Sequence, residues 1–184
     1  RMRALGMAHV PEDRHRMGLV LPFSAYQSSI LGYQRADKYN HGLTLDDPAI
    51  RTEYTGRAEQ FDIRPRYPFF GSNNFSGGNQ QKIVLAREIG ADPALLLVGQ
   101  PTRGVDIGAI EFIHQHIMDM RNEGKGILLV SVELDEIMTL SDRILVMCDG
   151  IITGEVSRED ANEQILGLLM ANALGATEQP GNTA

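Results

Sequence analysis

The chain has 184 residues, of which 42% are apolar and 22% charged, values typical of a globular domain with a sizeable core. Its formal net charge of -7 leaves no basic surplus to neutralise phosphates, which argues against a nucleic-acid partner. The single cysteine, Cys148, excludes an internal disulfide. No apolar run approaches the roughly 20 residues of a membrane-spanning helix. Because Met2 is not the first residue, we expect the chain to be a piece of a longer protein.

The first 75 residues predict short elements around a polar segment. Between residues 34 and 75 the composition becomes polar, aromatic and rich in arginine, with several prolines that interrupt regular structure. We expect this segment to form a subdomain or an interaction surface. The expected elements are a strand at 7–10, a charged loop at 12–18, a helix at 24–31 closed by Gly32, one or two helices around 48–61 and coil after them.

After Asn74 the pattern becomes regular, and short apolar runs alternate with amphipathic stretches. This alternation predicts a mainly parallel sheet flanked by helices. Asp149-Gly150 is a hairpin signal and adds an antiparallel edge. The expected elements are a helix at 79–89 capped by Ser76, a buried strand at 95–98, a helix from Asp106 to Gly124, a buried strand at 127–131, a helix at 134–140, strands at 143–148 and 151–156, and a last helix capped by Ser157.

We therefore expect an α/β fold with a helical subdomain and a C-terminal antiparallel hairpin. Five segments are predicted: an entry strand and loop of the core at 1–33, the helical and coil subdomain at 34–75, the main part of the core at 76–156, a C-terminal helix at 157–174 and a disordered tail at 175–184.

Ser76-Gly77-Gly78 opens a predicted helix and has the composition of an anion-binding turn. Free amides and the helix dipole favour a negative charge at this point, and glycine lets the backbone approach a phosphate closely. For these three residues alone, a glycine-rich turn capped by serine is the simpler interpretation. The longer run Ser76 to Lys82, followed by an amphipathic helix, is far more specific.

This longer run resembles the signature motif of ATP-binding cassette (ABC) ATPases, in the form found in tandem-cassette subunits of sugar and nucleoside importers. Three further segments agree with the resemblance, which covers roughly residues 6–170. Val10-Pro11-Glu12-Asp13-Arg14 is similar to a segment of the second cassette in those subunits, Leu95 to Asp106 to the Walker B strand and D-loop, and Ser131 to Glu136 to the switch segment. The resemblance implies a partial P-loop NTPase fold, the C-terminal part of a second cassette.

The sequence departs from the family pattern at three positions that serve the domain's own nucleotide. Where the family has the Walker B aspartate, the catalytic glutamate and the switch histidine, this chain has Gly99, Gln100 and Val132. An amide cannot usefully accept the proton of the attacking water. The phosphate-loop pattern GxxxxGK[ST] is also absent, and Gly124-Lys125-Gly126 does not match it. We therefore expect no intact catalytic residue and no metal ligand in this chain, which belongs to an ATPase but should be inactive alone.

The resemblance assigns the intact motif to a different nucleotide. In this family two cassettes pack head to tail, and each signature motif contacts the ATP held by the partner. Ser76, Gly77, Gly78 and Asn79 would then face the partner's ATP, with Asp106 at the same interface. ATP and Mg²⁺ would be held mainly by residues outside this chain. The implied partners are a second cassette and membrane permease subunits, at the cytoplasmic face of the plasma membrane.

Other residues are weaker candidates. His114 and His116 lie two positions apart on a predicted helix, so their rings cannot easily share a metal. Four arginines could bind an anionic partner, although a solvated helix surface is the better interpretation. Three phenylalanines could contact a membrane subunit or simply pack locally. These residues are Arg51, Arg57, Arg64, Arg66, Phe69, Phe70 and Phe75.

Two alternative functions remain open at this point. A soluble cassette of a DNA-repair or translation ATPase would share the signature motif, but such proteins usually carry basic or coiled-coil insertions, which this sequence lacks. A catalytically inert dimerisation module would retain the signature motif as a relic. The transported substrate cannot be read from this chain, because other subunits select it.

Overall fold

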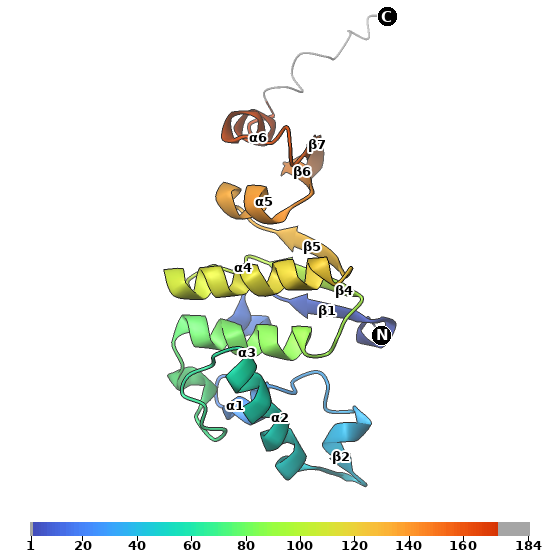
Figure 1. Cartoon of the computed structure of the whole chain (residues 1–184), viewed down its shortest axis with the longest axis vertical. Helices are drawn as coiled ribbons and strands as arrows, with labels where there is room; N and C mark the ends of the chain where they lie inside the picture. Colours follow the sequence, from blue (N-terminus) through green and yellow to red (C-terminus); the bar gives the residue numbers. More distant parts are fainter. Residues whose placement is uncertain (1, 173–184) are drawn as a thin grey trace, which may run out of the picture. The chain divides into compact units, whose positions relative to one another are not determined.

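The computed structural model describes residues 2–172 and divides them into two compact units, which meet in the sequence between Val130 and Ser131. Figure 1 labels their helices and strands. The segment boundaries expected at residues 33, 75, 156 and 174 stay predictions, and the tail expected to be disordered lies outside the described residues.

A parallel sheet of three strands runs through the first unit (Figure 1). Strand β4 (Leu95–Gly99) lies between β1 (Met7–Val10) and β5 (Gly126–Val130) and pairs in parallel with both. Leu96 and Val98 of the central strand are almost completely buried. The predicted parallel arrangement is confirmed, and it places the carboxyl ends of the three strands at one edge.

Two helices, α3 (Gly77–Ile89) and α4 (Ile107–Asn122), lie side by side, and α3 contacts β1 while α4 contacts β5 (Figure 1). The buried positions of α4 recur every three or four residues, as an amphipathic helix requires. The predicted caps are confirmed, because Ser76 and Asp106 stand at the N-cap positions of α3 and α4. The buried residues of α4 are Ala109, Ile113, Ile117 and Met120.

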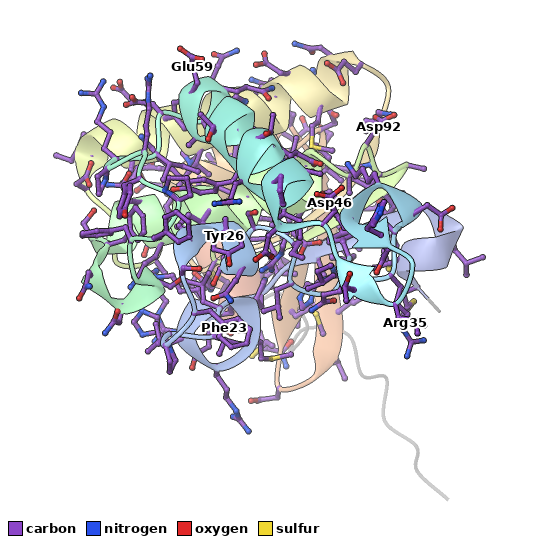
Figure 2. All side chains as sticks on the ribbon, turned by 90° about the horizontal axis from the view of Figure 1, so that it is seen from below. Phe23, Tyr26, Arg35, Asp46, Glu59 and Asp92 are labelled. Atoms are coloured by element: carbon purple, nitrogen blue, oxygen red, sulfur yellow. The ribbon has the colours of Figure 1, made fainter. Side chains whose placement is uncertain are left out.

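The segment between β1 and α3 consists of short helices, one long helix, a pair of two-residue strands and irregular stretches. Asp46, labelled in Figure 2, caps the long helix α2 by accepting a 3.0 Å hydrogen bond from the backbone of Ala49, which confirms the helix predicted around 48–61. The helix predicted at 24–31 is much shorter, because turns follow its first four residues. The elements are α1 (Ala25–Ser28), η3 (Asp37–Tyr39), β2 (Asn40–His41), β3 (Thr44–Leu45), α2 (Asp47–Gln60) and η4 (Ser72–Asn74), and a short turn η1 (Arg3–Leu5) precedes β1.

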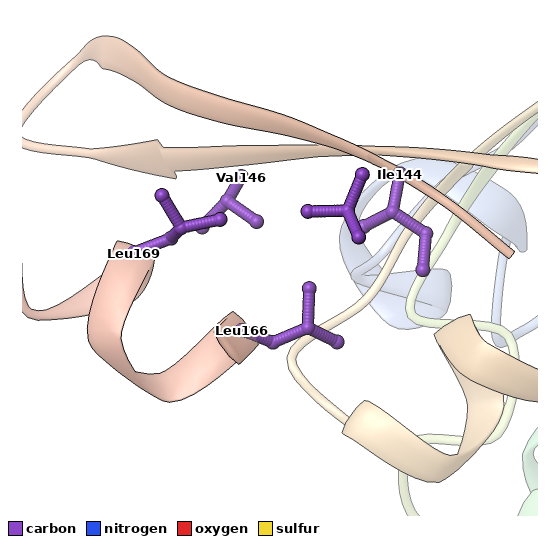
Figure 3. Close-up of a cluster of buried hydrophobic side chains, with 5 residues drawn as sticks. Ile144, Val146, Leu166 and Leu169 are labelled. Carbon is purple, nitrogen blue, oxygen red and sulfur yellow. The ribbon is translucent and has the colours of Figure 1, made fainter. Parts of the chain in front are cut away.

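The second unit consists of a helix, a hairpin and a final helix: α5 (Leu134–Leu140), β6 (Arg143–Cys148), β7 (Ile151–Ser157) and α6 (Glu163–Met170). Its core lies between the hairpin and α6, where Ile144, Val146, Leu166 and Leu169 pack together (Figure 3). The antiparallel pairing of β6 with β7 confirms the predicted hairpin. Its turn places both central residues at positive φ, as the favoured hairpin turn requires.

Three local predictions are wrong. Residues 14–18 form a π-helical turn, η2 (Arg14–Gly18), because Asp13 accepts the backbone hydrogen bonds that start it. Strand β5 is not buried: Val130 is 59% exposed, because β5 is the edge of its sheet and an apolar run does not reveal whether a strand is central. The last helix is capped by Asn162 instead of Ser157, whose hydroxyl bonds the side chain of Asp160.

Candidate functional site

The predicted signature residues surround the amino end of α3. The exposed Ser76 hydroxyl accepts the backbone N–H of Asn79 at 3.4 Å and the Asn79 amide at 3.0 Å. The other end of that amide accepts the backbone N–H of Arg64 at 2.7 Å. The Asn79 side chain is therefore fixed at both ends, while the Ser76 hydroxyl stays accessible at the positive end of the helix dipole.

Gly77 and Gly78 pack directly against the segment between β4 and α4. A Cβ atom on Gly77 would lie 2.6 Å from the carbonyl oxygen of Gly104, and one on Gly78 would lie 2.9 Å from the Asp106 carboxylate. At Gly77 a Cβ atom would displace the D-loop backbone, and at Gly78 it would displace the Asp106 side chain. The same carboxylate caps α4 by accepting the backbone N–H of Ala109 at 2.9 Å. The structure thus brings together all five predicted binding residues.

An open groove of about 320 Å³ lies beside these residues and receives the amino ends of both α3 and α4. It contains two basic and two acidic side chains. The hydrogen bond from Arg64 is the main reason that the pKa of Asp62 is lowered. The lining residues are Asp62, Arg64, Gly78, Asn79, Lys82, Asp106, Gly108 and Ala109.

The segment from residue 100 to residue 106, which we call the D-loop, is anchored by Arg14 from the turn after β1. The Arg14 guanidinium donates to the carbonyl oxygens of Arg103 at 2.7 Å and Gly104 at 3.3 Å. Glu12 of the preceding loop pairs with the Arg103 side chain at 2.6 Å. Burial lowers the pKa of Arg14, and the charge of Arg103 adds to this effect, while Asp13 opposes it. An arginine remains charged at neutral pH in such a setting.

The carboxyl end of β4 carries Gly99 and Gln100, the positions expected to be degenerate. A Cβ atom on Gly99 would lie 3.1 Å from the backbone nitrogen of Glu12, so the loop after β1 passes close over this position. Gln100 has a φ of 47°, an uncommon conformation for a residue other than glycine, and its N–H bonds the Val130 carbonyl at 2.8 Å. Neither residue offers a carboxylate.

Val132, the third position expected to be degenerate, belongs to the second unit and is 67% exposed. It lies between β5 and α5, where the Ser131 hydroxyl accepts the backbone N–H of Glu133 at 3.1 Å. Its aliphatic side chain can neither donate a hydrogen bond nor carry charge. Within residues 2–172 there is no group of three or more His, Cys, Asp or Glu side chains arranged to hold a metal ion.

The four arginines noted in the sequence have partners within the chain. Arg57 is buried, pairs with Glu53 and donates to the carbonyl oxygen of Ser29 at 3.1 Å. The others contact Asp62, Glu59 or the ring of Phe69. These contacts favour a structural role over an anionic partner.

The aromatic candidates also pack within the chain. The ring of Phe75 is buried and meets that of Phe70 at 4.9 Å, whereas Phe69 is 49% exposed. His116 stacks on Phe61 with ring centroids 4.4 Å apart, and burial lowers its pKa. Local packing therefore accounts for Phe70 and Phe75, and aromatic stacking for His116.

Comparison with known proteins finds ATP-binding proteins of importers among the relatives. The chain is 47% identical over 165 residues to the nucleoside import ATP-binding protein NupA of Lactococcus lactis, an overlap that spans 89% of this chain and 32% of the relative. It is 43% identical over 178 residues to the glucose import ATP-binding protein TsgD13 of Haloferax volcanii, spanning 96% of this chain and 32% of the relative. No protein-family model matches the chain.

Solved structures agree on the fold. A nucleotide-free ATP-binding cassette from an ABC transporter matches with a TM-score of 0.68 and 17% identity, over 91% of this chain and 66% of that structure. A dimeric cassette in a post-hydrolysis state, bound to ADP and phosphate, matches with a TM-score of 0.67 and 20% identity, over 85% of this chain and 64% of that structure. The chain belongs to the ATP-binding cassette family. It spans about a third of the length of the curated relatives it matches.

The cassette fold confirms the predicted class, a partial P-loop NTPase with a mainly parallel sheet, a helical segment and an antiparallel hairpin. None of the described helices of this cassette is long and apolar enough to cross a membrane. Sequence reasoning missed the roles of Arg14, Asp62 and Lys82 beside the signature residues. Asp13 was the one local signal near Arg14, because an aspartate side chain that accepts backbone N–H groups two and three residues later favours a turn.

Proposed function

We propose that this chain is part of the second cassette in the ATP-binding subunit of a sugar or nucleoside importer. In this proposal the chain contributes Ser76, Gly77, Gly78, Asn79 and Asp106 to the ATP held by another cassette. Its own nucleotide site, marked by Gly99, Gln100 and Val132, is degenerate. The import role comes from the named functions of the relatives, which include a guanosine import ATP-binding protein of Bacillus subtilis.

One observation carries the proposal: an accessible Ser76 hydroxyl and two closely packed glycines lie at the amino end of α3, against an intact D-loop. This arrangement fits a phosphate, because the helix end supplies backbone donors and positive potential. Preorganised donors of this kind stabilise the charge that develops during phosphoryl transfer. The chain's own residues would bind and orient the partner's nucleotide at closure.

The residues at the end of β4 do not fit a magnesium ion or a catalytic base. Gly99 has no ligand atom, and the Gln100 amide is a poor proton acceptor. Neither residue can supply a ligand or a base for hydrolysis. Mg²⁺ and the phosphates of ATP would be held mainly by residues that this chain does not contain. The partner cassette, the permease subunits and a peripheral position at the cytoplasmic face of the membrane are parts of the same proposal.

Steady-state ATP turnover of the full-length subunit that contains this chain tests the proposal. Replacing Ser76→Arg should lower the turnover number on the order of a hundredfold, because a bulky side chain then fills the place of the phosphate donor. Asn162→Arg is the matched control, since it also removes an N-cap but lies in the second unit. It should leave turnover unchanged.

Unchanged turnover in the Ser76→Arg subunit would mean that the signature motif serves no nucleotide. The inert dimerisation module would then be the better account. A second measurement uses this chain alone, which should release no phosphate from ATP. Steady phosphate release by the pure chain would contradict the degenerate site.

A further inference from the structure

The turn after β1 is attached to the signature helix α3 by His15 and is braced internally by Asp13. His15 donates through Nε2 to the Gln80 side chain of α3 at 2.7 Å, since the Gln80 amide group already donates to the carbonyl oxygen of Ser72. The carboxylate of Asp13 fixes the start of the turn by accepting the backbone N–H groups of His15 and Arg16. The residue between these anchors, Arg14, is therefore held in a defined direction.

The Arg14 guanidinium fills the corner between the D-loop and the signature motif. Its two terminal nitrogens donate to adjacent D-loop carbonyl oxygens, at 2.7 and 3.3 Å. A Cβ atom on Gly77 would lie only 2.8 Å from one of these nitrogens. One side chain thus contacts both segments that the proposed function assigns to the partner's ATP.

Among the described residues no carboxylate forms an ion pair with Arg14, although the charge of Asp13 partly offsets the effect of burial on its pKa. Within residues 2–172 no ion pair at 4.0 Å or less involves Arg14, and its Nε atom is buried without a hydrogen-bond partner. The two carbonyl oxygens are its main polar contacts. A planar fork that donates to two acceptors at once is a property of arginine that lysine lacks.

The same loop also touches the end of β4. Glu12 lies against Gly99, where a Cβ atom would be 3.1 Å from its backbone nitrogen, and its carboxylate pairs with Arg103 of the D-loop. The loop after β1 therefore contacts the chain's own degenerate site at Glu12 and the signature half-site at Arg14.

We propose that Arg14 is a positioning residue that holds the D-loop against Gly77 and so sets the geometry of the half-site offered to the partner's ATP. This proposal rests on the proposed function. Arg14 acts through Gly77 and the D-loop and does not itself contact the nucleotide. Without its fork the two carbonyl oxygens lose their shared donor, and the D-loop can move away from α3.

Kinetics of the full-length subunit separate this role from general stability. Arg14→Met should lower kcat roughly tenfold with KM for ATP within about twofold, since the nucleotide is held by the other cassette and meets this half-site only at closure. Arg14→Lys keeps the charge without the fork and should give an intermediate kcat. Arg16→Met, two residues along the same turn, is exposed in the structure and should match the unmodified subunit.

Amide hydrogen exchange in the D-loop distinguishes a positioning role from a general effect on stability. In Arg14→Met the amides of residues 102–106 should exchange faster, while those of α6 stay unchanged. In Arg16→Met both regions should stay unchanged. Slower turnover with unaltered exchange in the D-loop would overturn the positioning role, as would a kcat equal to that of Arg16→Met.

The two proposals fail in different ways. If Ser76→Arg abolishes turnover while Arg14→Met and Arg14→Lys leave it intact, the half-site stands and Arg14 has no positioning role. If Ser76→Arg leaves turnover intact, the proposed function fails first. If the Arg14→Met subunit does not fold, the kcat of Arg14→Lys tests the positioning role instead. The lysine retains the charge and the aliphatic packing, so this variant is expected to fold.

Discussion

The amino end of α3 and the carboxyl end of β4 belong to the same unit, and glycine stands at the critical position of each. At α3, Gly77 and Gly78 bring the D-loop within contact of a helix end that keeps its serine hydroxyl and its amide. At β4, Gly99 brings the backbone of Glu12 over the strand end. Both places are closely packed, but polar groups suited to a phosphate are present only at the amino end of α3.

The two glycines therefore differ in what excludes a side chain. At Gly99 a Cβ atom would lie 3.1 Å from the backbone of Glu12, so the loop after β1 would have to shift only slightly to admit a side chain. At Gly77 a side chain is excluded by the backbone of the D-loop. Gly77 is tied to the geometry of the proposed half-site, whereas Gly99 stands where we propose that the chain's own site is degenerate.

The largest expected effect comes from filling the contact at α3. Gly77→Ala places a methyl group against the Gly104 carbonyl oxygen, which should destabilise the fold by about 1–3 kcal/mol and lower turnover of the full-length subunit on the order of a hundredfold. Gly56→Ala, in the middle of α2 with nothing within 4 Å, is the control. It should stabilise by about 0.5–1 kcal/mol. Thermal unfolding and ATP turnover measure both variants.

A smaller effect is expected from the cap that the D-loop supplies to α4. Asp106→Ala removes the acceptor of the Ala109 N–H and should cost about 1 kcal/mol of stability, measured as a lower Tm of the subunit. Asp106→Asn keeps an acceptor oxygen and should lose only part of this. Equal Tm values for the two variants would show that the cap is not what Asp106 contributes.

Restoring carboxylates at β4 should change activity little. Gly99→Asp with Gln100→Glu supplies two acidic groups, but the chain has no phosphate-loop pattern, and the new Cβ at residue 99 must displace Glu12 slightly. ATP turnover by this chain should therefore stay at background. A clear Mg²⁺-dependent increase in ATP turnover would mean that the absence of carboxylates at residues 99 and 100 alone accounts for the missing activity.

The smallest effect concerns pH and the stacked ring on α4. Burial lowers the pKa of His116, so the folded chain binds this proton less readily than the unfolded chain. The resulting stability is fully present above the unfolded pKa of about 6.5 and is lost as the pH falls through the lowered folded value. His116→Phe should flatten the dependence of Tm on pH between about 7 and 5. An unchanged slope of Tm against pH would mean that other titrating groups cause the pH dependence of stability.

The regular elements could be predicted because their signals are local. Ser76 and Asp106 cap helices through their own side chains, and the alternation of apolar residues sets the strands and helices after Asn74. The exposure of β5 could not be predicted, since it depends on which strands lie beside it. The cap by Asn162 was missed because Ser157 offers the same chemistry a few residues earlier.

The candidate site was predictable only where one short segment carries it. The run from Ser76 to Asn79 is contiguous, and its motif also located Asp106. Arg14 reaches the D-loop from a turn far away in the sequence, and Asp62 and Lys82 meet only because α2 ends near α3. Such long-range contacts leave no periodicity or spacing in the sequence.

In the proposed function the chain serves another cassette's ATP and not its own. ATP turnover of the full-length subunit, measured for Ser76→Ala and Gln100→Ala under the same conditions, distinguishes the two sites. Ser76→Ala removes a polar group at the signature motif and should lower kcat at least tenfold, whereas Gln100→Ala should change it less than about twofold. The reverse result, a loss in Gln100→Ala with full activity in Ser76→Ala, would contradict the account.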